Sequence, residues 1–277
     1  MHDKRNSILR QRHFGSGLAD TGVKIIDAYG WGVEFKKGNL QSLAVNFFGT
    51  MHLGSRIRVK ILSEILKGED LSKKSLFDAG CGVGLVSVYL ANRFKRVLAA
   101  DLNREKIVEA KKLAKANFIK NINFVMKDLT KFRFKNQFFD VIICLEVIEH
   151  VSDDKKFING LGKILKRGGK IILSFPASSF INKIAQKSLD HHKVGYKPKD
   201  IEYLLEENGL KIVEEYSYGR GPLGKLVFAI DFIFKKTLPI LSVIFFPLFY
   251  PILILDYKFS KSRNPENYIL VIKKRYD

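Results

Sequence analysis

Cysteine is scarce in this chain, which has only two, Cys81 and Cys144, among its 277 residues. One lies in a glycine-rich turn and the other in an apolar segment, so neither fits a disulfide framework or a zinc-binding pattern. This scarcity is typical of a protein in a reducing compartment, and we expect this protein to be cytoplasmic. The first 17 residues are polar and basic and have no apolar core, so no secretory signal is expected.

Negative charge is also in short supply. The chain has 28 acidic residues against 48 lysines and arginines, which gives a formal net charge of +20. Such an excess favours an anionic partner, either nucleic acid or the anionic face of a membrane. A proteome that is rich in lysine throughout is the alternative, and the net charge alone does not choose between them.

The chain is organised around a glycine-rich turn between two short apolar runs. Asp78 ends the first run and Asp101 ends the second, and the glycines of the turn are Gly80, Gly82 and Gly84. Strand, turn, helix and strand in this order form a nucleoside-binding unit. Glycine lets the backbone turn sharply and lets a ligand approach closely, because it has no Cβ. A carboxylate at Asp101 can accept both hydroxyls of a ribose.

The spacing of the glycines indicates which cofactor is bound. A dinucleotide-binding turn has the pattern Gly-x-Gly-x-x-Gly, but here the third glycine comes one place early and Leu85 stands where a small residue is needed. The pattern from Asp78 to Gly84 instead resembles motif I of the class I S-adenosylmethionine-dependent methyltransferases. A dinucleotide fold and a purely structural turn are the alternatives.

Further motifs extend this resemblance over residues 72–218. They are the Phe-Asp-Val at 139–141, the Glu-His-Val at 149–151 and the Leu-Lys-Arg-Gly-Gly at 165–169. The chain is most similar to methyltransferase type 11, in the branch with the ubiquinone-biosynthesis O-methyltransferases and many lipid and small-molecule enzymes. The resemblance implies an α/β fold, a Rossmann-like three-layer sandwich. Its seven-stranded sheet is mostly parallel, with the antiparallel last strand between strands five and six.

Hydrophobic patterns along the chain place the elements of this fold. The expected strands are 75–78, 97–101, 121–126, 138–145, 170–175, 210–218 and 267–274. The expected helices are 55–66 with Ser55 as a possible N-cap, one capped by Asn103 and running to about 117, one from Ser152 to about 165, and one opening at 197–200. The residues 166–169 are expected to form a tight turn into the fifth strand.

The family resemblance implies a site for S-adenosyl-L-methionine. In this family an acidic residue after the third strand contacts the adenine amino group, and the backbone of the next residue contacts the ring. Asp128 and Leu129 match these two positions, although a surface turn is the alternative. The residues expected to hold the cofactor are Asp78, Gly80, Cys81, Gly82, Gly84, Leu85, Asp101, Leu102, Asp128, Leu129 and Glu146.

In the resembling fold, the acceptor lies over the C-terminal ends of strands four and five, where Glu146, Glu149 and His150 are found. His191 and His192 follow strand five and could fold over the same pocket. Because an oxygen nucleophile such as a phenol needs a base, we expect His150 to serve first, then His192, with Glu149 as a further catalytic residue. A structural role for His150 at a helix start is the alternative.

The same acidic and histidine residues allow a second interpretation. Glu146, Glu149 and His150 resemble the residues that bind a divalent ion in the ubiquinone O-methyltransferases. An ion there would orient a catechol and lower the pKa of its hydroxyl. Relatives without a metal share this series, so we expect a metal-free site and keep the divalent ion as an alternative.

One long apolar run stands between the last two strands. No charged residue occurs between Lys236 and Asp256, and about 20 apolar residues can span a bilayer. A single crossing would put the last strand on the wrong side of the membrane, however, and Pro239, Pro247 and Pro251 are expected to break a straight helix. We therefore expect a hairpin dipping into one leaflet, or helices lying in its interface.

Lysines flank this apolar run and could meet lipid headgroups. They are Lys225, Lys235, Lys236, Lys258 and Lys261. A cap on the domain, a dimer surface and a true transmembrane pass are the alternatives to membrane contact.

The chain divides into an N-terminal arm at 1–54, a methyltransferase domain at 55–218 and 267–277, and an apolar insertion at 219–266. The expected function is O-methylation of a lipid-like or membrane-associated small molecule by an enzyme that is peripheral on the inner face of the membrane. A soluble sugar or metabolite as acceptor, with the insertion as a dimer or lid surface, is one alternative. A membrane-binding module with a degenerate fold is another.

A nucleic acid substrate is not favoured, because the Asn/Asp-Pro-Pro-Tyr/Phe signature of amino-methylating enzymes is missing. The oligomeric state does not follow from the sequence.

Overall fold

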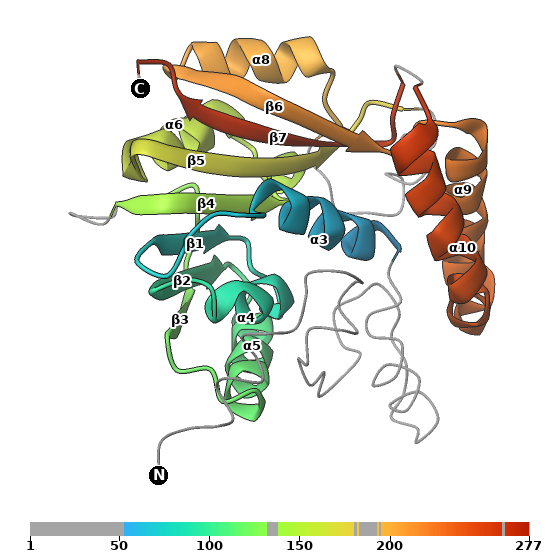
Figure 1. Cartoon of the computed structure of the whole chain (residues 1–277), viewed down its shortest axis with the longest axis horizontal. Helices are drawn as coiled ribbons and strands as arrows, with labels where there is room; N and C mark the ends of the chain where they lie inside the picture. The colour runs from blue at the N-terminus through green and yellow to red at the C-terminus, as the bar shows by residue number, and fades with distance from the viewer. Residues whose placement is uncertain are drawn as a thin grey trace.

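The structure is a computed structural model that describes residues 53–131, 138–179, 182, 193, 195–261 and 264–276. Its centre is a seven-stranded sheet in the order β3-β2-β1-β4-β5-β7-β6 (Figure 1). The strands are β1 Ser75–Ala79, β2 Arg96–Asp101, β3 Ile122–Met126, β4 Phe139–Leu145, β5 Leu165–Pro176, β6 Leu210–Tyr218 and β7 Asn267–Lys274. Neighbouring strands are parallel except where β7 pairs with β5 and β6. The predicted sheet and its antiparallel last strand are confirmed.

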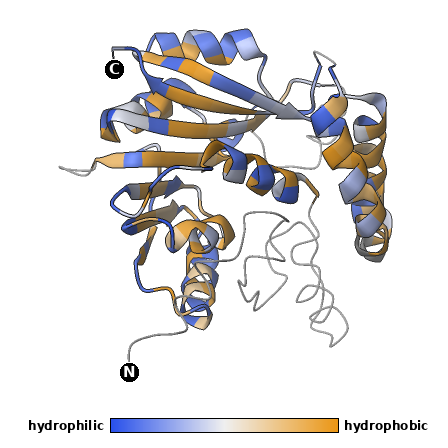
Figure 2. Cartoon of the chain, viewed as in Figure 1, coloured by the Kyte–Doolittle hydropathy of each residue, from blue (hydrophilic) through white to orange (hydrophobic). Residues whose placement is uncertain are grey.

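Helices cover both faces of the sheet. They are α3 Leu53–Ile65, α4 Leu85–Ala91, α5 Arg104–Ala116, the short 3-10 helix η2 Ile148–His150, α6 Asp154–Ile164, α8 Pro198–Glu206, α9 Pro222–Thr237 and α10 Pro239–Phe259. Apolar side chains of α3, α4 and α10 pack on one face of the sheet, and those of α6 and α8 pack on the other. Figure 2 shows how the apolar residues gather in the strands and in α9 and α10.

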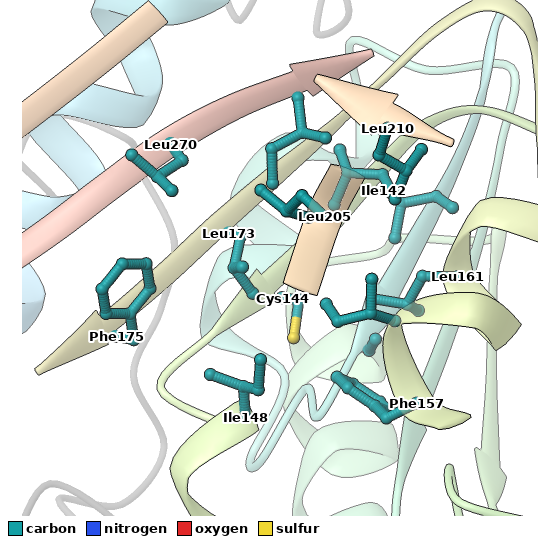
Figure 3. Close-up of a cluster of buried hydrophobic side chains, with 14 of the residues drawn as sticks. Ile142, Cys144, Ile148, Phe157, Leu161, Leu173, Phe175, Leu205, Leu210 and Leu270 are labelled. Atoms are coloured by element: carbon teal, nitrogen blue, oxygen red, sulfur yellow. The ribbon is translucent and has the colours of Figure 1, made fainter. Parts of the chain in front are cut away.

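The central strands are apolar on both faces because helices cover both. In β4, Ile142 and Cys144 point into the cluster beneath α6 and α8, while Val141 and Ile143 point to the side of α3 and α4. Figure 3 shows the first cluster, where Ile142 and Cys144 lie with Phe157 and other apolar side chains. This packing fixes the edge of the sheet at which β1 and β4 end.

Two predicted helix starts differ from the structure. Helix α6 begins at Asp154 and not at Ser152, and its N-cap is Asp153, whose carboxylate accepts the backbone N–H of Lys156 at 2.9 Å. A carboxylate is the stronger partner for a helix N-terminus, because its charge also interacts with the helix dipole. Ser55 lies inside α3 and does not cap it. The predicted cap of α5 is confirmed, since the Asn103 side chain accepts the N–H of Lys106 at 3.0 Å.

The strand β5 begins at Leu165, so the tight turn predicted at 166–169 falls within the strand and not before it. The pairing of β4 with β5 shifts register between Phe139 and Val141, which is the signature of a bulge. Gly168 has φ of 69°, a left-handed conformation that glycine adopts without steric cost. Four residues, 166–169, therefore lie opposite one residue of β4, and regular pairing with β4 resumes at Lys170.

Two helices, α9 and α10, join β6 to β7 and pack against each other. Pro247 and Pro251 were expected to break a straight helix, but both lie inside α10. Each proline removes one backbone hydrogen bond, and this cost is offset by burial of Phe246, Phe249 and Leu253 in the cluster that α3 shares. Among the residues that the structure describes, no helix combines the length and apolar character needed to cross a bilayer.

Nearly all of the expected N-terminal arm lies outside the described residues. Only its last two residues, Leu53 and Gly54, are described, and they begin α3.

Gly84 and Gly68 allow a matched test of packing at the glycine turn. Both have φ of 78°, but a Cβ on Gly84 would lie 2.8 Å from Ala110 and Phe124, while a Cβ on Gly68 would meet nothing within 4 Å. Gly68→Ala should lower the free energy of unfolding by about 1 kcal/mol, from backbone conformation alone. Gly84→Ala should lower it by about 2–4 kcal/mol, because overpacking is added. Urea unfolding of both variants measures this, and equal losses would show that the close packing at Gly84 is unimportant.

Candidate functional site

The glycine turn follows β1 and is tied to the end of β2. The N–H groups of Gly80 and Cys81 donate to the carbonyl of Ala100 at 2.8 and 2.9 Å. A Cβ on Gly80 would lie 2.2 Å from the Val147 side chain, whereas a Cβ on Gly82 would meet no atom of the described residues within 4 Å. Gly80 is therefore required by packing, and Gly82 leaves open space over the turn, as a backbone cradle for a ligand needs.

The carboxylate of Asp101 lies against this turn. Its Oδ2 accepts the N–H of Gly82 at 2.8 Å, and its Oδ1 accepts the N–H of Asn103 at 2.9 Å. A carboxylate has about four lone-pair positions, so Asp101 keeps the capacity to accept the hydroxyls of a ribose over Gly82. This geometry fits the nucleoside end of the cofactor.

Asp78 is buried below the turn, with 3% of its surface exposed, and accepts a hydrogen bond from the Ser87 hydroxyl. Burial raises the pKa of this carboxyl to about 7, and the negative charge of Asp101 adds to the rise, although the Ser87 hydrogen bond opposes it. Asp78 therefore holds its proton to a higher pH than an ordinary aspartate.

Three other predicted contacts differ in exposure. The side chain of Leu85 is buried in the cluster between α4 and α5, so only its backbone can face a ligand. Leu102 is exposed. Cys81 is half-buried, and burial raises the pKa of its thiol above the ordinary value. These residues remain predicted contacts of the cofactor.

Asp128 forms a tight local turn after β3. Its Oδ1 accepts both the N–H and the hydroxyl of Thr130, at 2.9 and 2.6 Å. Hydrogen bonds from Thr130 hold the pKa of this carboxyl below its usual value. Leu129 is half-buried against the core. The turn fixes Asp128 as an ionised acceptor at the same edge of the sheet as Asp101.

A polar cluster forms at the end of β4, around Glu146. This residue has φ of 57°, which is uncommon for a residue with a side chain and often marks a functional site. Its N–H donates to the carbonyl of Ser174 at 3.1 Å, and its Oε1 accepts the Ser174 hydroxyl at 2.8 Å. The backbone and the side chain of Glu146 are thus both hydrogen-bonded to β5.

Arg58 of α3, which is not among the predicted site residues, completes this cluster. Its guanidinium lies 3.5 Å from Glu146 and donates to the Tyr218 hydroxyl and to Ser55 Oγ, each at 3.1 Å. Burial alone would lower the pKa of Arg58, but Tyr218 and Glu146 hold it above its ordinary value. No motif marks Arg58, because α3 shows only the spacing of an amphipathic helix. The one available signal is a charged residue within its apolar stripe.

Glu149 points inward, with 1% of its surface exposed, and its Oε2 has no hydrogen-bond partner among the described residues. Burial and the nearby charge of Glu146 raise its pKa well above the ordinary value, which favours the protonated form. Its carbonyl accepts the N–H of Lys193 at 3.1 Å. His150, the last residue of η2, is exposed. His191 and His192 lie outside the described residues.

In the alternative interpretation, Glu146, Glu149 and His150 would bind a divalent ion. Within the described ranges, no group of three or more His, Cys, Asp or Glu side chains is arranged to hold a metal ion. Glu146 is instead engaged by Arg58 and Ser174.

A mostly parallel sheet with a glycine turn and an acidic residue at the ends of β1 and β2 defines a nucleoside-binding α/β protein. Comparison with known proteins identifies its family. The model of the methyltransferase domain matches residues 77–173. The ubiquinone biosynthesis O-methyltransferase of Rickettsia canadensis is 31% identical over 181 residues, which cover 60% of this chain and 76% of the relative.

Solved structures agree with this fold. The magnesium protoporphyrin IX methyltransferase of Synechocystis, with bound SAH, has a TM-score of 0.54 at 19% identity and covers 89% of this chain and 91% of its own. A putative sarcosine dimethylglycine methyltransferase of Galdieria sulphuraria has a TM-score of 0.59 at 14% identity and covers 80% and 86%. The chain belongs to the class I S-adenosylmethionine-dependent methyltransferases, and its cofactor is S-adenosylmethionine.

Replacing Asp101 tests the ribose contact. Asp101→Ala should weaken the binding of S-adenosylmethionine at least about tenfold, because charge-assisted hydrogen bonds are lost. Titration calorimetry measures the dissociation constant. The control is Asn103→Ala, which removes the cap of α5 and should cost about 1 kcal/mol of stability while leaving the affinity unchanged. An unchanged affinity in Asp101→Ala would contradict the site.

Asp78 should make stability depend on pH. Between about pH 4 and 7 the unfolded chain ionises this carboxyl while the folded protein keeps its proton, so stability falls as pH rises, by up to about 1.4 kcal/mol per pH unit. Asp78→Asn never ionises, so its stability relative to the wild type should rise over the same range. Asp70→Asn is the control, since hydrogen bonds from Ser72 lower the pKa of Asp70. Urea unfolding at several pH values measures both, and a constant difference for Asp78→Asn would contradict the prediction.

Proposed function

We propose that this methyltransferase transfers a methyl group to an oxygen atom of a lipid-like or membrane-associated small molecule. The proposal draws on the printed activity of its relatives, which are ubiquinone biosynthesis O-methyltransferases. The observation that carries it is the position of α3 between the site and an apolar helix. Arg58 of α3 lies beside Glu146, and two residues earlier Arg56 lies over the rings of Phe246 and Tyr250 of α10, at 5.2 and 4.9 Å.

When bound, S-adenosylmethionine supplies an electrophilic methyl group. The residues of this chain hold and orient the reactants, which supplies much of the rate enhancement in such a displacement. Gly82 and Asp101 would hold the ribose, and Asp128 would accept from the adenine amino group. Ser174 and Arg58 fix the end of β4, over which the acceptor would lie.

The proton of an acceptor hydroxyl requires a base, and the exposed His150 is our first candidate. Glu149 is less suited to this task, because burial and the charge of Glu146 raise its pKa and favour its protonated form. In that state it acts instead as a hydrogen-bond donor toward an acceptor oxygen. His192 is the second candidate for the base. Its neighbour Lys193 is tied through its N–H to the carbonyl of Glu149.

We further propose that the enzyme works as a peripheral protein on the anionic, cytoplasmic face of a membrane. The net charge of +20 supports this, since basic surfaces are attracted to anionic lipids. The substrate test compares methyl transfer to a phenol with a polyprenyl tail and to the same phenol without one. We expect a higher kcat/KM for the tailed phenol in detergent micelles, and equal values would overturn the lipid-like acceptor.

His150→Gln tests the base. It should lower kcat for a phenolic acceptor by about 10²–10⁴-fold and remove the decline of kcat on the acid side of the pH profile. The affinity for S-adenosylmethionine should not change. Added imidazole should restore part of the activity, which a merely structural role would not allow. A wild-type kcat and pH profile in His150→Gln would remove His150 from the mechanism.

A further inference from the structure

The helical hairpin formed by α9 and α10 has an inverted distribution of polar and apolar residues. Its only acidic residues are Asp231 and Asp256, and both are buried, with 3% and 8% of their surface exposed. Eight aliphatic and aromatic side chains are instead each more than half exposed: Leu223, Leu226, Ile233, Leu238, Ile244, Leu248, Leu255 and Phe259. A helix in water normally buries such residues and exposes its acids, so this surface is suited to a less polar medium.

Of the two buried carboxylates, Asp256 joins the two helices and Asp231 forms an ion pair within α9. Asp256, near the end of α10, accepts the N–H groups of Arg220 and Gly221 at 2.8 and 2.7 Å, which fixes the start of α9. Asp231 pairs with Lys235 at 2.6 Å. The apolar surface is therefore presented by a packed element that is joined at its base.

The charges that remain on the hairpin are all positive. Lys236 and Lys258 are both exposed, and they lie at opposite ends of the hairpin, Lys236 beside the turn between the helices and Lys258 at the last turn of α10. A 21-residue helix such as α10 is about 30 Å long, so the two ammonium groups are far apart. Anionic lipid headgroups complement this arrangement.

We propose that the α9–α10 hairpin lies flat in the interface of an anionic lipid leaflet. Its aliphatic surface enters the acyl boundary, and the lysines at both ends reach the headgroups. Insertion with the turn leading would carry Lys236 into the hydrocarbon, which costs about 2.5–3.5 kcal/mol or more for each charge. The flat orientation avoids this cost and keeps every exposed aliphatic residue near the same depth. This proposal rests on the proposed membrane function and names the surface and its orientation.

The first test measures co-sedimentation with vesicles of phosphatidylglycerol and phosphatidylcholine. The double variant Ile233→Glu and Leu248→Glu should lower the partition coefficient at least about tenfold, because two charges enter the interface. Val108→Glu, on the exposed surface of α5, is the matched control and should bind like the wild type. Calorimetry with S-adenosylmethionine should give the same affinity for all three proteins, which shows that the fold is intact.

The second test measures orientation. In a Trp31→Phe background, one tryptophan is placed at Leu238, in the turn, or at Leu255, near the other end of α10. The flat orientation predicts equal, shallow quenching of both by lipids that carry a quencher along the acyl chain. Deep quenching at position 238 with none at 255 would overturn the orientation.

Two further outcomes would contradict the proposal that this surface binds lipid. In one, the wild type fails to bind anionic vesicles. In the other, the double glutamate variant keeps full vesicle binding but changes from dimer to monomer in light scattering, which would make the surface a contact between two copies. Neither outcome touches methyl transfer to a detergent-solubilised acceptor, so failure of the surface and failure of the enzymatic proposal are distinguishable.

Discussion

The hydrogen bond from the Gly82 N–H to Asp101 is the contact on which the site depends. It joins the turn after β1 to the end of β2, so the backbone that cradles a ligand and the carboxylate that recognises it are held as one unit. The bonds from Gly80 and Cys81 to Ala100 reinforce this junction. Because Val147 lies against Gly80, the turn also fixes the segment after β4, where the reacting groups are proposed to lie. A change at this junction would therefore affect both halves of the site.

Much of the fold could be predicted from the sequence, because its signals are local. β6 and β7 have the predicted bounds, and the cap at Asn103 agrees with the structure. The place of β7 between β5 and β6 was implied by the family resemblance and also agrees. Errors arose where tertiary packing decides. Residues 166–169 were predicted to form a turn before the fifth strand, but Leu165 already pairs with Phe139 of β4, so β5 begins ahead of them. Pro247 and Pro251 read as helix breakers, but the apolar packing of α10 accommodates both.

The site shows the same division. The glycine turn and its acidic residues could be found because their spacing is fixed within one chain segment. Arg58 could not, because it comes from a helix before the first strand and meets Glu146 and Tyr218 only in the folded protein. The raised pKa of the Glu149 carboxyl could not be predicted from the sequence either. A glutamate in a sequence is ordinarily taken to be an ionised carboxylate, whereas burial beside Glu146 favours the neutral acid here.

The position of β7 has a consequence for the way the protein is made. β6 pairs with β7 and with no other strand of the described sheet, and α9 and α10 come between them in the chain. During synthesis from the N-terminus, the apolar hairpin therefore emerges before the strand that fastens β6 to the sheet. For that interval the hairpin is joined to an incomplete domain, so a membrane or a chaperone can meet it before the domain closes.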